Sequence, residues 1–346
     1  MPKETPLRVA VIGCGRIFRK HLEAIESNSA FSLQGVYDSD PVRAKSASEE
    51  SNTPTFETLE SLMAGARPDL VSVLVPSGAH YEIAKKLADY EVPVLVEKPL
   101  TLDTKQAQDL VLDFQARGVP LFIVKQNRLN EPVLEARSVL DNQRLGKLLA
   151  ASASLLWCRP EGYYLQDTWR LSRKMDGGVL WNQASHYVDL LCNFLGEIEL
   201  VSAFGSNFLS PAETEDTVFA ILRTRQGLLG SIQATTAVRP QNFEGSLTLT
   251  FERGLLRIGG HALNKIEADT AGVLAGGTES NVSAESSSKA DVYGQGHTAL
   301  YNEVAIDLLD GPESRFRAKN GLQSVAVMES IHKSIDSGLP VRVPTI

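Results

Sequence analysis

The sequence is poor in cysteine and lacks any long apolar stretch. Its three cysteines, Cys14, Cys158 and Cys192, show neither CxxC nor metal-ligand spacing, so we expect reduced thiols, a cytoplasmic location and no metal site. No apolar run is long enough to cross a bilayer, and the N-terminus passes into a strand-like run without a cleavable signal pattern. These absences argue against a membrane role.

Basic residues are also fewer than acidic residues. The chain has 34 Lys and Arg residues against 42 Asp and Glu residues, which gives a net charge of -8. This balance argues against nucleic acid as the main partner. An anionic small ligand is still compatible with it, because such a ligand responds to the local field. The length of 346 residues suggests two domains or one large one.

The first third of the chain alternates between apolar runs and helical patterns. Five runs are too uniformly apolar for half-solvated strands, and they lie at residues 7–13, 31–38, 69–76, 92–99 and 120–127. Between them, Asp40-Pro41 and Asp103 have the composition of helix starts, and Gly118 that of a helix end. The pattern predicts an α/β fold with a doubly wound parallel sheet over residues 1–124.

The second domain, expected at residues 125–346, has a different order of strand-like and helical segments. Longer strand-like runs follow one another at residues 148–158, 198–208, 216–224, 227–238 and 244–254, and several are joined by short turns. This favours a mostly antiparallel sheet. Helices are expected at 177–196, 298–310 and 320–337, and a Gly/Ser/Ala-rich surface loop at 270–290.

One of these expected strands has apolar residues at both its odd-numbered and its even-numbered positions, and therefore on both faces. Val218, Ala220 and Leu222 alternate with Phe219 and Ile221. Helices of one domain cover one face of such a sheet, so the other face needs a partner. The pattern predicts a homodimer or a homotetramer.

A dinucleotide site is predicted at the first strand-to-helix junction. Gly13-Cys14-Gly15 allows a tight turn and close approach of a pyrophosphate, although Phe18 occupies the place of the usual third glycine. An ordinary tight turn is the alternative. Asp38 follows at the end of the second run, where it can bind a ribose diol. A carboxylate about 4 Å from a 2'-phosphate costs roughly 4 kcal/mol at an effective dielectric of about 20, so NAD is expected rather than NADP. Arg43, which could shield that charge, is expected to face solvent.

Two further segments follow buried runs. Ser77 and His80 come after the run that ends at residue 76, and Ser77 could equally cap the next helix. Glu97-Lys98-Pro99 closes the run that begins at residue 92. Such a segment can simply end a strand, but the carboxyl edge of a parallel sheet is where ligands bind. A lysine in an apolar site beside a cationic nicotinamide is suited to acid/base chemistry.

The helix expected at 177–196 is apolar almost all round and therefore buried. Asn182, His186 and Asp189 nevertheless share one face of it. A core histidine with satisfied hydrogen bonds and a catalytic histidine are both compatible with this pattern.

Together these motifs resemble the Gfo/Idh/MocA family of NAD(P)-dependent sugar oxidoreductases. The resemblance rests on G-C-G-R-I, Y-D, P-S-G-x-H, E-K-P and N-x-x-S-H-x-x-D, and it weakens at residues 270–294. It implies a Rossmann domain followed by an α/β domain with an open-faced sheet. It also implies that Lys98 and His186 are the catalytic residues. The position four before the histidine is often aspartate in the family and is Asn182 here. The cofactor-binding set is expected to be Gly13, Gly15, Arg16, Ile17, Asp38, Pro76, Ser77, His80, Glu97, Lys98, Gln126, Trp169 and Arg170.

A narrower resemblance, carried by FIVKQNR, NQASH and QNFEGSLTLTFERGLLRIGG, is to the WlbA/WbpB branch. It implies oxidation of the 3-hydroxyl of UDP-N-acetylglucosaminuronic acid during surface polysaccharide synthesis, with 2-oxoglutarate as a possible oxidant of the bound NADH. The substrate-binding set is expected to be Lys98, Arg159, Arg173, Asn182, His186 and Arg239. Another sugar or cyclitol dehydrogenase, a ketoreductase and a non-catalytic NAD-binding regulator are the alternatives.

Overall fold

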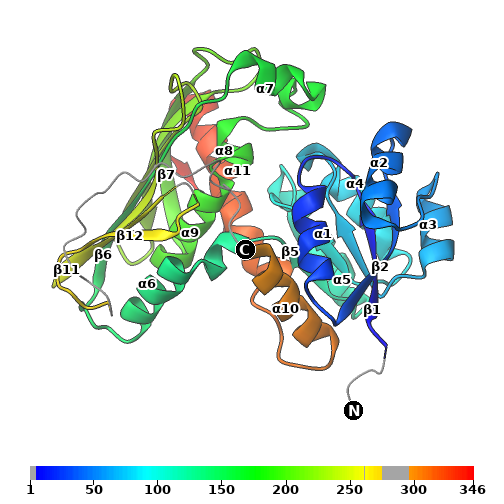
Figure 1. Cartoon of the computed structure of the whole chain (residues 1–346). Helices are drawn as coiled ribbons and strands as arrows, with labels where there is room; N and C mark the ends of the chain where they lie inside the picture. Colours follow the sequence, from blue (N-terminus) through cyan, green and yellow to red (C-terminus); the bar gives the residue numbers. More distant parts are fainter. Residues whose placement is uncertain (1–4, 261, 275–295) are drawn as a thin grey trace. The chain divides into compact units, whose positions relative to one another are not determined.

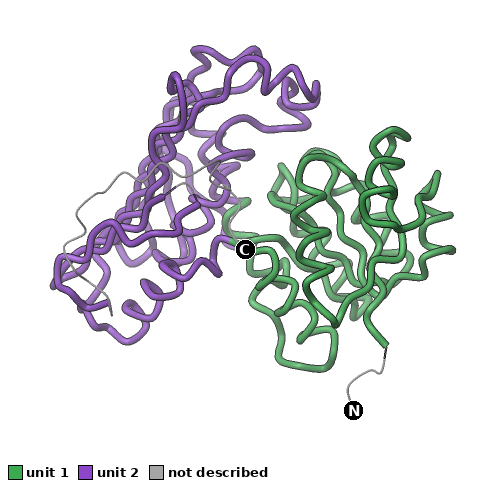
Figure 2. Tube along the Cα trace, viewed as in Figure 1, with its two compact units in different colours: residues 1–126, 295–325 green, residues 127–294, 326–346 purple. Residues whose placement is uncertain are grey.

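The computed structural model describes residues 5–260, 262–274 and 296–346 and divides the chain into two compact units (Figure 2). Unit 1 comprises residues 1–126 and 295–325, and unit 2 comprises residues 127–294 and 326–346. The expected boundary after residue 124 lies two residues before the end of the first segment of unit 1. Beyond residue 274, the loop expected at 270–290 lies outside the described residues.

Residues 295–325, expected in the second domain, belong to unit 1. Their helix α10 (Gly296–Leu308) packs against α1 (Phe18–Glu26) and buries Leu300, Tyr301 and Val304 completely. An apolar stripe predicts that a helix is buried, but it does not identify the sheet or helix that covers it.

Unit 1 contains a five-stranded parallel sheet in the order β2-β1-β3-β4-β5 (Figure 1). Its strands are β1 (Leu7–Ile12), β2 (Phe31–Tyr37), β3 (Leu70–Val73), β4 (Val94–Val96) and β5 (Leu121–Ile123). Its other helices are α2 (Pro41–Ser51), α3 (Leu59–Ala66), α4 (His80–Ala88) and α5 (Thr104–Ala116). Every residue of β3, β4 and β5 is buried, which confirms the expected doubly wound sheet. The strand order reverses between β1 and β3, so the ligand site of such a sheet lies at the carboxyl ends of these strands.

The expected helix ends in unit 1 are also present. The Asp40 carboxylate accepts a hydrogen bond from Val42 N–H, and the Asp103 carboxylate accepts one from Gln106 N–H, both at 2.9 Å. Gly118 follows the C-cap of α5 with a φ of 68°. These caps fix where α2 begins and where α5 begins and ends.

Unit 2 contains an eight-stranded sheet in the order β12-β11-β10-β6-β9-β8-β7-β13. Its strands are β6 (Leu148–Leu156), β7 (Ile198–Ser206), β8 (Thr217–Thr224), β9 (Leu229–Thr235), β10 (Glu244–Phe251), β11 (Gly254–Gly259), β12 (Lys265–Asp269) and β13 (Val341–Arg342). Its helices are α6 (Glu131–Asp141), α7 (Glu161–Leu165), α8 (Val179–Asn182), α9 (Ser185–Leu195) and the part of α11 (Leu322–Ser337) from Ala326 onward. Among the described strands of unit 2, only β6 and β9 pair in parallel, so the mostly antiparallel sheet is confirmed.

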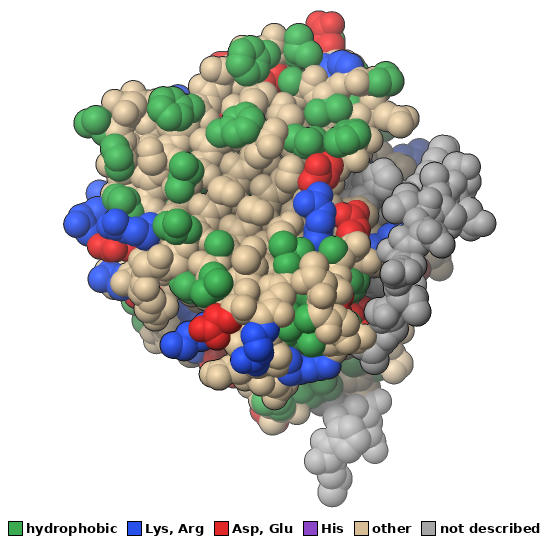
Figure 3. Space-filling model, turned by 90° about the vertical axis from the view of Figure 1, so that its left-hand side faces the viewer, with side chains coloured by type: hydrophobic (Ala, Val, Ile, Leu, Met, Phe, Trp, Pro, Cys, Tyr) green, Lys and Arg blue, Asp and Glu red, His purple; other side chains and the backbone are tan. Residues whose placement is uncertain are grey.

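The two faces of this sheet differ as the sequence predicts. On β8, Val218, Ala220 and Leu222 are at most 3% exposed, whereas Phe219 and Ile221 are 51% and 64% exposed. Phe219 of β8 lies opposite Phe204 of β7, so the part of the uncovered face that β7 and β8 form is apolar. A depression of about 390 Å³ lies over this face, and hydroxyl side chains of β6, β9 and β10 line its other side. Green apolar side chains are spread over the face seen in Figure 3.

Two expectations about the whole chain bear on its chemistry. Cys14, Cys158 and Cys192 all carry free thiols. Among the helices that the structure describes, none combines the length and apolar character needed to cross a bilayer.

Candidate active-site residues in the two units

The two glycines after β1 are constrained differently. Gly13 has a φ of 97°, and a Cβ there would lie 2.7 Å from the carbonyl carbon of Leu74. At Gly15, the nearest described atom to an added Cβ is Nη1 of Arg43, at 3.9 Å. Gly13 is therefore required by the packing of the chain itself, whereas Gly15 leaves room for a ligand.

The entrance to α1 also suits a phosphate. Arg16 is exposed in the loop, and the N-cap residue Ile17 makes no side-chain capping hydrogen bond. Phe18 N–H and Lys20 N–H of this turn donate to Gly15 O at 3.1 Å and to Ile17 O at 3.0 Å, so a phosphate here would be held by the loop and by the positive end of the helix dipole. With the open space at Gly15, this fits the pyrophosphate of a dinucleotide.

Asp38 faces the glycine loop from the end of β2. Its carboxylate accepts hydrogen bonds from Cys14 N–H at 2.7 Å and from Asp40 N–H at 2.8 Å. Each carboxylate oxygen has a second lone pair, so both can also accept from a ribose hydroxyl. Burial, together with the Asp38 charge, raises the pKa of Cys14 to about 12 and keeps its thiol neutral.

Arg43 lies closer to this loop than expected. Its side chain is exposed and forms an ion pair with Asp40 at 3.4 Å, but its guanidinium also reaches towards Gly15. It therefore borders the proposed phosphate site instead of pointing wholly into solvent.

The segment after β3 binds the backbone of its own unit. Ser77 is buried and opens a 3₁₀ turn after Pro76, and the helix that follows has no side-chain cap, so the capping role considered for Ser77 is not seen. His80 is 1% exposed, with Nδ1 2.7 Å from Pro99 O and Nε2 2.9 Å from Val75 O. Both ring nitrogens of His80 thus face backbone carbonyls.

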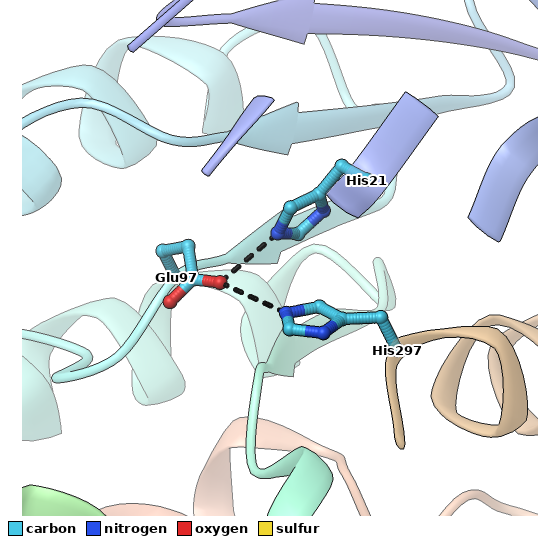
Figure 4. Close-up of side chains that lie close together, drawn as sticks. All are labelled: His21, Glu97 and His297. Atoms are coloured by element: carbon cyan, nitrogen blue, oxygen red, sulfur yellow. Dashed lines mark hydrogen bonds and ion pairs between the residues drawn. The ribbon is translucent and has the colours of Figure 1, made fainter. Parts of the chain in front are cut away.

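Glu97 is buried at the end of β4 within a cluster of side chains (Figure 4). Its Oε1 lies 2.9 Å from His21 Nε2 and 3.6 Å from His297 Nε2, and Oε2 accepts a hydrogen bond from Lys98 N–H at 2.9 Å. Burial opposes ionisation of Glu97, but the hydrogen-bonding contribution of the two histidines holds its pKa well below the usual range.

The cluster continues away from the carboxylate. His21 Nδ1 lies 2.9 Å from the Tyr301 hydroxyl, which lies 2.8 Å from Ser72 Oγ. Burial lowers the pKa of His21, so the neutral ring can donate to Glu97 and accept from Tyr301. His21, Glu97 and His297 have the donor types of a metal site. Because both His21 nitrogens are within hydrogen-bond distance of partners, we interpret the cluster as a hydrogen-bonded support for Glu97.

Unit 1 brings most of its predicted residues to one edge of the sheet. Gly13, Asp38, Ser77 and Lys98 follow the carboxyl ends of β1, β2, β3 and β4. Lys98 is half-buried, and Gln126 is buried at the end of the first segment of unit 1.

The helix expected over residues 177–196 in unit 2 is interrupted. Asn182 ends α8, and His186 lies half-buried in the first turn of α9. Val179 O accepts from Gln183 N–H at 3.1 Å and from Ala184 N–H at 2.9 Å, which shifts the hydrogen-bond ladder by one residue. The expectation of one continuous helix over residues 177–196 is therefore wrong.

Two carboxylates flank this segment. Buried Asp176, in the loop before α8, accepts a hydrogen bond from the Asn182 amide and another from Gly178 N–H at 3.2 Å. Asp189 forms a paired contact with Arg128, with Nε–Oδ2 and Nη2–Oδ1 distances of 2.7 Å. Asp176 thus holds the Asn182 side chain by a hydrogen bond, whereas Asp189 fixes α9 to the turn that carries Arg128.

Two of the predicted arginines belong to an aromatic cluster. Arg170 is buried, pairs with Asp167, and lies 4.8 Å from the Trp169 ring and 4.6 Å from the Tyr163 ring. The Arg159 guanidinium lies 5.2 Å from the same Tyr163 ring. Cation–π stacking holds these guanidinium planes in place.

Two other arginines have partners nearer the surface. Arg173 pairs with Asp336 at 2.8 Å, and both are exposed. Exposed Arg239 donates to the carbonyls of Thr236 at 3.0 Å and Val238 at 2.8 Å. A guanidinium has five N–H donors, so these contacts leave others for an anion.

Sequence reasoning missed His21, His297, Asp176 and Arg128. His21 lies three residues beyond Phe18 on α1, and a polar residue on the buried side of that helix was the available signal. His297 had no comparable signal, because its partner Glu97 is 200 residues away.

Two sequence models of one oxidoreductase family match the chain. The model described as an oxidoreductase family with an NAD-binding Rossmann fold matches residues 7–125, and the GFO/IDH/MocA C-terminal domain matches residues 133–257. Together these ranges include β1 to β10 and most of both units' sheets.

Solved structures with the same fold cover the whole chain. The WlbA dehydrogenase from Bordetella pertussis, in complex with NADH and UDP-GlcNAcA, is 31% identical, with a TM-score of 0.89 and 99% coverage of both chains. The WlbA enzyme from Chromobacterium violaceum, with the same two ligands, is 30% identical, with a TM-score of 0.89 and coverage of 100% of this chain and 98% of that one.

Curated relatives are more distant. The myo-inositol dehydrogenase Hyg17 of Streptomyces leeuwenhoekii is 27% identical over 261 residues, which span 73% of this chain and 77% of Hyg17. The chain spans as little as 39% of the length of another curated relative, a UDP-N-acetylglucosamine 3-dehydrogenase of Acidithiobacillus ferrooxidans.

Alanine at the two loop glycines is expected to separate folding from cofactor binding. Gly13→Ala forces a methyl group against backbone at positive φ, so it should lower the free energy of unfolding by ~1–3 kcal/mol. Gly15→Ala meets open space, so it should unfold like the wild type but bind NAD at least ~10-fold more weakly, a loss of about 1.4 kcal/mol. Urea denaturation and calorimetric NAD titration measure the two effects. Unchanged NAD affinity in Gly15→Ala would contradict the placement of the pyrophosphate.

Proposed function

The chain belongs to the Gfo/Idh/MocA family of oxidoreductases, and from that premise we propose that it oxidises the 3-hydroxyl of UDP-N-acetylglucosaminuronic acid with NAD. The observation that carries the proposal is the full-length similarity to two dehydrogenases whose structures contain NADH and this sugar acid. Both are at least 30% identical to this chain.

Unit 1 is an NAD-binding Rossmann domain. We propose that Gly15 and the first turn of α1 hold the pyrophosphate of NAD and that Asp38 holds the adenosine ribose. When bound, NAD accepts the hydride that leaves the sugar carbon. The free lone pairs of Asp38 and the room at Gly15 support this arrangement.

We propose that Lys98 and His186 serve the proton transfer. His186 takes the proton of the 3-hydroxyl as the carbon loses its hydride, and Lys98 orients that oxygen and stabilises its developing charge. The position of Lys98 at the carboxyl edge of the sheet and the half-buried environment of His186 support these roles. Asn182, backed by Asp176, is proposed to contact the sugar.

The anionic groups of the substrate are assigned to arginines of unit 2. Arg159, Arg173 and Arg239 are the proposed contacts, because guanidinium groups match carboxylate and phosphate geometry. Their present partners leave N–H donors available in an otherwise acidic chain. Trp169 and Arg170 are proposed to contact the cofactor.

We further propose a cytoplasmic reaction that contributes to surface polysaccharide synthesis. Free thiols and the need for NAD support the location. Oxidation of an isolated secondary alcohol by NAD is uphill at neutral pH. An external 2-oxo acid such as 2-oxoglutarate is therefore proposed to take the hydride and a proton, which converts it to a 2-hydroxy acid and regenerates NAD.

A second candidate function is oxidation of a cyclitol. The similarity to the myo-inositol dehydrogenase Hyg17 favours it, although the identity is lower and the coverage shorter than for the WlbA enzymes. A cyclitol carries no diphosphate or carboxylate, so the two candidates differ in their need for the arginines.

The substrate assay follows NADH absorbance with three compounds, each with and without 2-oxoglutarate. The compounds are UDP-N-acetylglucosaminuronic acid, its uncharged parent UDP-N-acetylglucosamine, and myo-inositol. We expect turnover with the sugar acid and little with the other two, because only the sugar acid offers a carboxylate to the arginines. Preference for the uncharged parent would contradict carboxylate recognition, and activity on myo-inositol alone would overturn the nucleotide-sugar proposal.

Two variants serve as controls in that assay. Lys98→Met and His186→Ala are expected to bind NAD and to lose turnover by ~10²–10⁴-fold each, as acid/base groups do. A His186→Ala protein with wild-type kcat would show that His186 is an ordinary core residue.

We propose that the uncovered face of the unit 2 sheet is an interface between copies of this chain, in a dimer or tetramer. Phe204, Phe219 and Ile221 on that face are each more than half exposed. An exposed apolar patch of this kind usually marks a surface that another molecule covers. Light scattering at micromolar concentration is expected to find a dimer or tetramer. The double variant Phe219→Glu with Ile221→Glu should reduce its mass, whereas Val42→Glu, at a position 75% exposed in unit 1, should not. A monomeric wild type would contradict the proposal.

A further inference from the structure

The backbone just before and just after the Lys98 side chain is held by two different buried side chains. Glu97 Oε2 accepts the N–H of Lys98 at 2.9 Å. One residue further on, Pro99 O lies 2.7 Å from Nδ1 of His80, the first residue of α4. Glu97 and His80 are 6% and 1% exposed. The backbone that carries Lys98 is therefore held at both ends by buried side chains.

His80 was expected to bind the cofactor, but its polar atoms are directed elsewhere. Nδ1 faces Pro99 O, and Nε2 lies 2.9 Å from Val75 O at the end of β3. The ring therefore bridges the segment after β3 and the segment after β4, which are adjacent strands. Because both ring nitrogens lie within hydrogen-bond distance of backbone carbonyls, the ring directs neither of them at a ligand.

The protonation of His80 indicates which contact is the stronger one. Burial lowers the pKa of His80, although the two carbonyls and the Glu97 charge act in the opposite direction. A neutral ring carries one N–H, and the shorter contact assigns it to Nδ1, which then donates to Pro99 O. Val75 O would accept a hydrogen bond only from the protonated ring.

We propose that His80 is a positioning residue that holds the Lys98–Pro99 segment at the carboxyl edge of the sheet, and not a ligand of NAD. The inference rests on the proposed function, in which Lys98 acts at the substrate hydroxyl. His80 holds the backbone that follows Lys98. Glu97, which His21 and His297 support, holds the N–H of Lys98 itself. Misplacing a catalytic group by about 1 Å can cost ~10²-fold in rate, so loss of this support should lower kcat.

Asparagine and glutamine at position 80 test the two contacts separately. The amide nitrogen of asparagine can occupy the place of Nδ1, and that of glutamine the place of Nε2. His80→Asn therefore keeps a donor for Pro99 O, and His80→Gln keeps one only for Val75 O. We expect His80→Gln and His80→Ala to lose ~10–100-fold in kcat, while His80→Asn stays within about 3-fold of the wild type. KM for NAD should change little in all three.

A second measurement does not depend on the substrate. Hydrogen–deuterium exchange of the NAD-free protein, followed in peptides that span residues 94–104, reports how firmly the segment is held. Uptake should rise in His80→Gln and remain near wild type in His80→Asn. Tyr81→Phe, at the next residue of α4, removes a hydroxyl that contacts Asp109 and should leave both readouts unchanged.

The outcomes separate this inference from the proposed function. A wild-type protein that does not oxidise the sugar acid refutes the proposed function, and the exchange comparison still decides whether His80 holds the segment. Equal behaviour of His80→Asn and His80→Gln in exchange would overturn the positioning role. A loss that appears as weaker NAD binding with unchanged kcat would restore His80 as a cofactor ligand.

Discussion

The carboxylate of Glu97 has to be both ionised and buried at the end of an inner strand of the unit 1 sheet. Moving a charge out of water costs several kcal/mol, so such a group persists only where hydrogen bonds replace the lost solvent. Here His21 Nε2 lies at 2.9 Å, Lys98 N–H donates at 2.9 Å, and His297 Nε2 lies at 3.6 Å. Each contact comes from a different part of unit 1: α1, the segment after β4, and α10. One charge thereby sets where these three segments meet.

This requirement explains why residues 295–325 belong to unit 1 and not to the domain that precedes them in sequence. Helix α10 supplies His297 to the carboxylate and Tyr301 to His21, and both side chains are at most 2% exposed. A unit that lacked this helix would leave Glu97 under-compensated, and Lys98 would lose part of the support for its backbone. The chemistry proposed for Lys98 therefore depends on a segment that lies about 200 residues further along the chain.

Much of this arrangement could be predicted from local sequence. Uniformly apolar runs identified the parallel strands, Asp40 and Asp103 marked helix starts, and the parity of Val218 and Phe219 separated the two faces of the unit 2 sheet. These features depend on neighbours in sequence. The contacts to Glu97 do not, since His21 is 76 residues away and His297 is 200 residues away. The break between α8 and α9 was also hidden, because a one-residue shift in a ladder leaves the apolar pattern intact. The partners of Arg159, Arg170 and Arg239 follow from loop geometry, which composition does not specify.

The most direct test of a buried, ionised Glu97 is the stability of Glu97→Gln relative to the wild type as a function of pH. The pKa of Glu97 is well below its unfolded value of 4.5, so the charged form stabilises the folded state. That contribution is fully present above the unfolded pKa and is lost as pH falls through the folded pKa. Urea unfolding between about pH 2 and 7 should therefore show a stability difference between the two proteins that is constant near neutrality and shrinks as pH falls below the unfolded pKa. Glu57→Gln, at an exposed position, should show little difference. A difference between wild type and Glu97→Gln that does not change with pH would contradict the account.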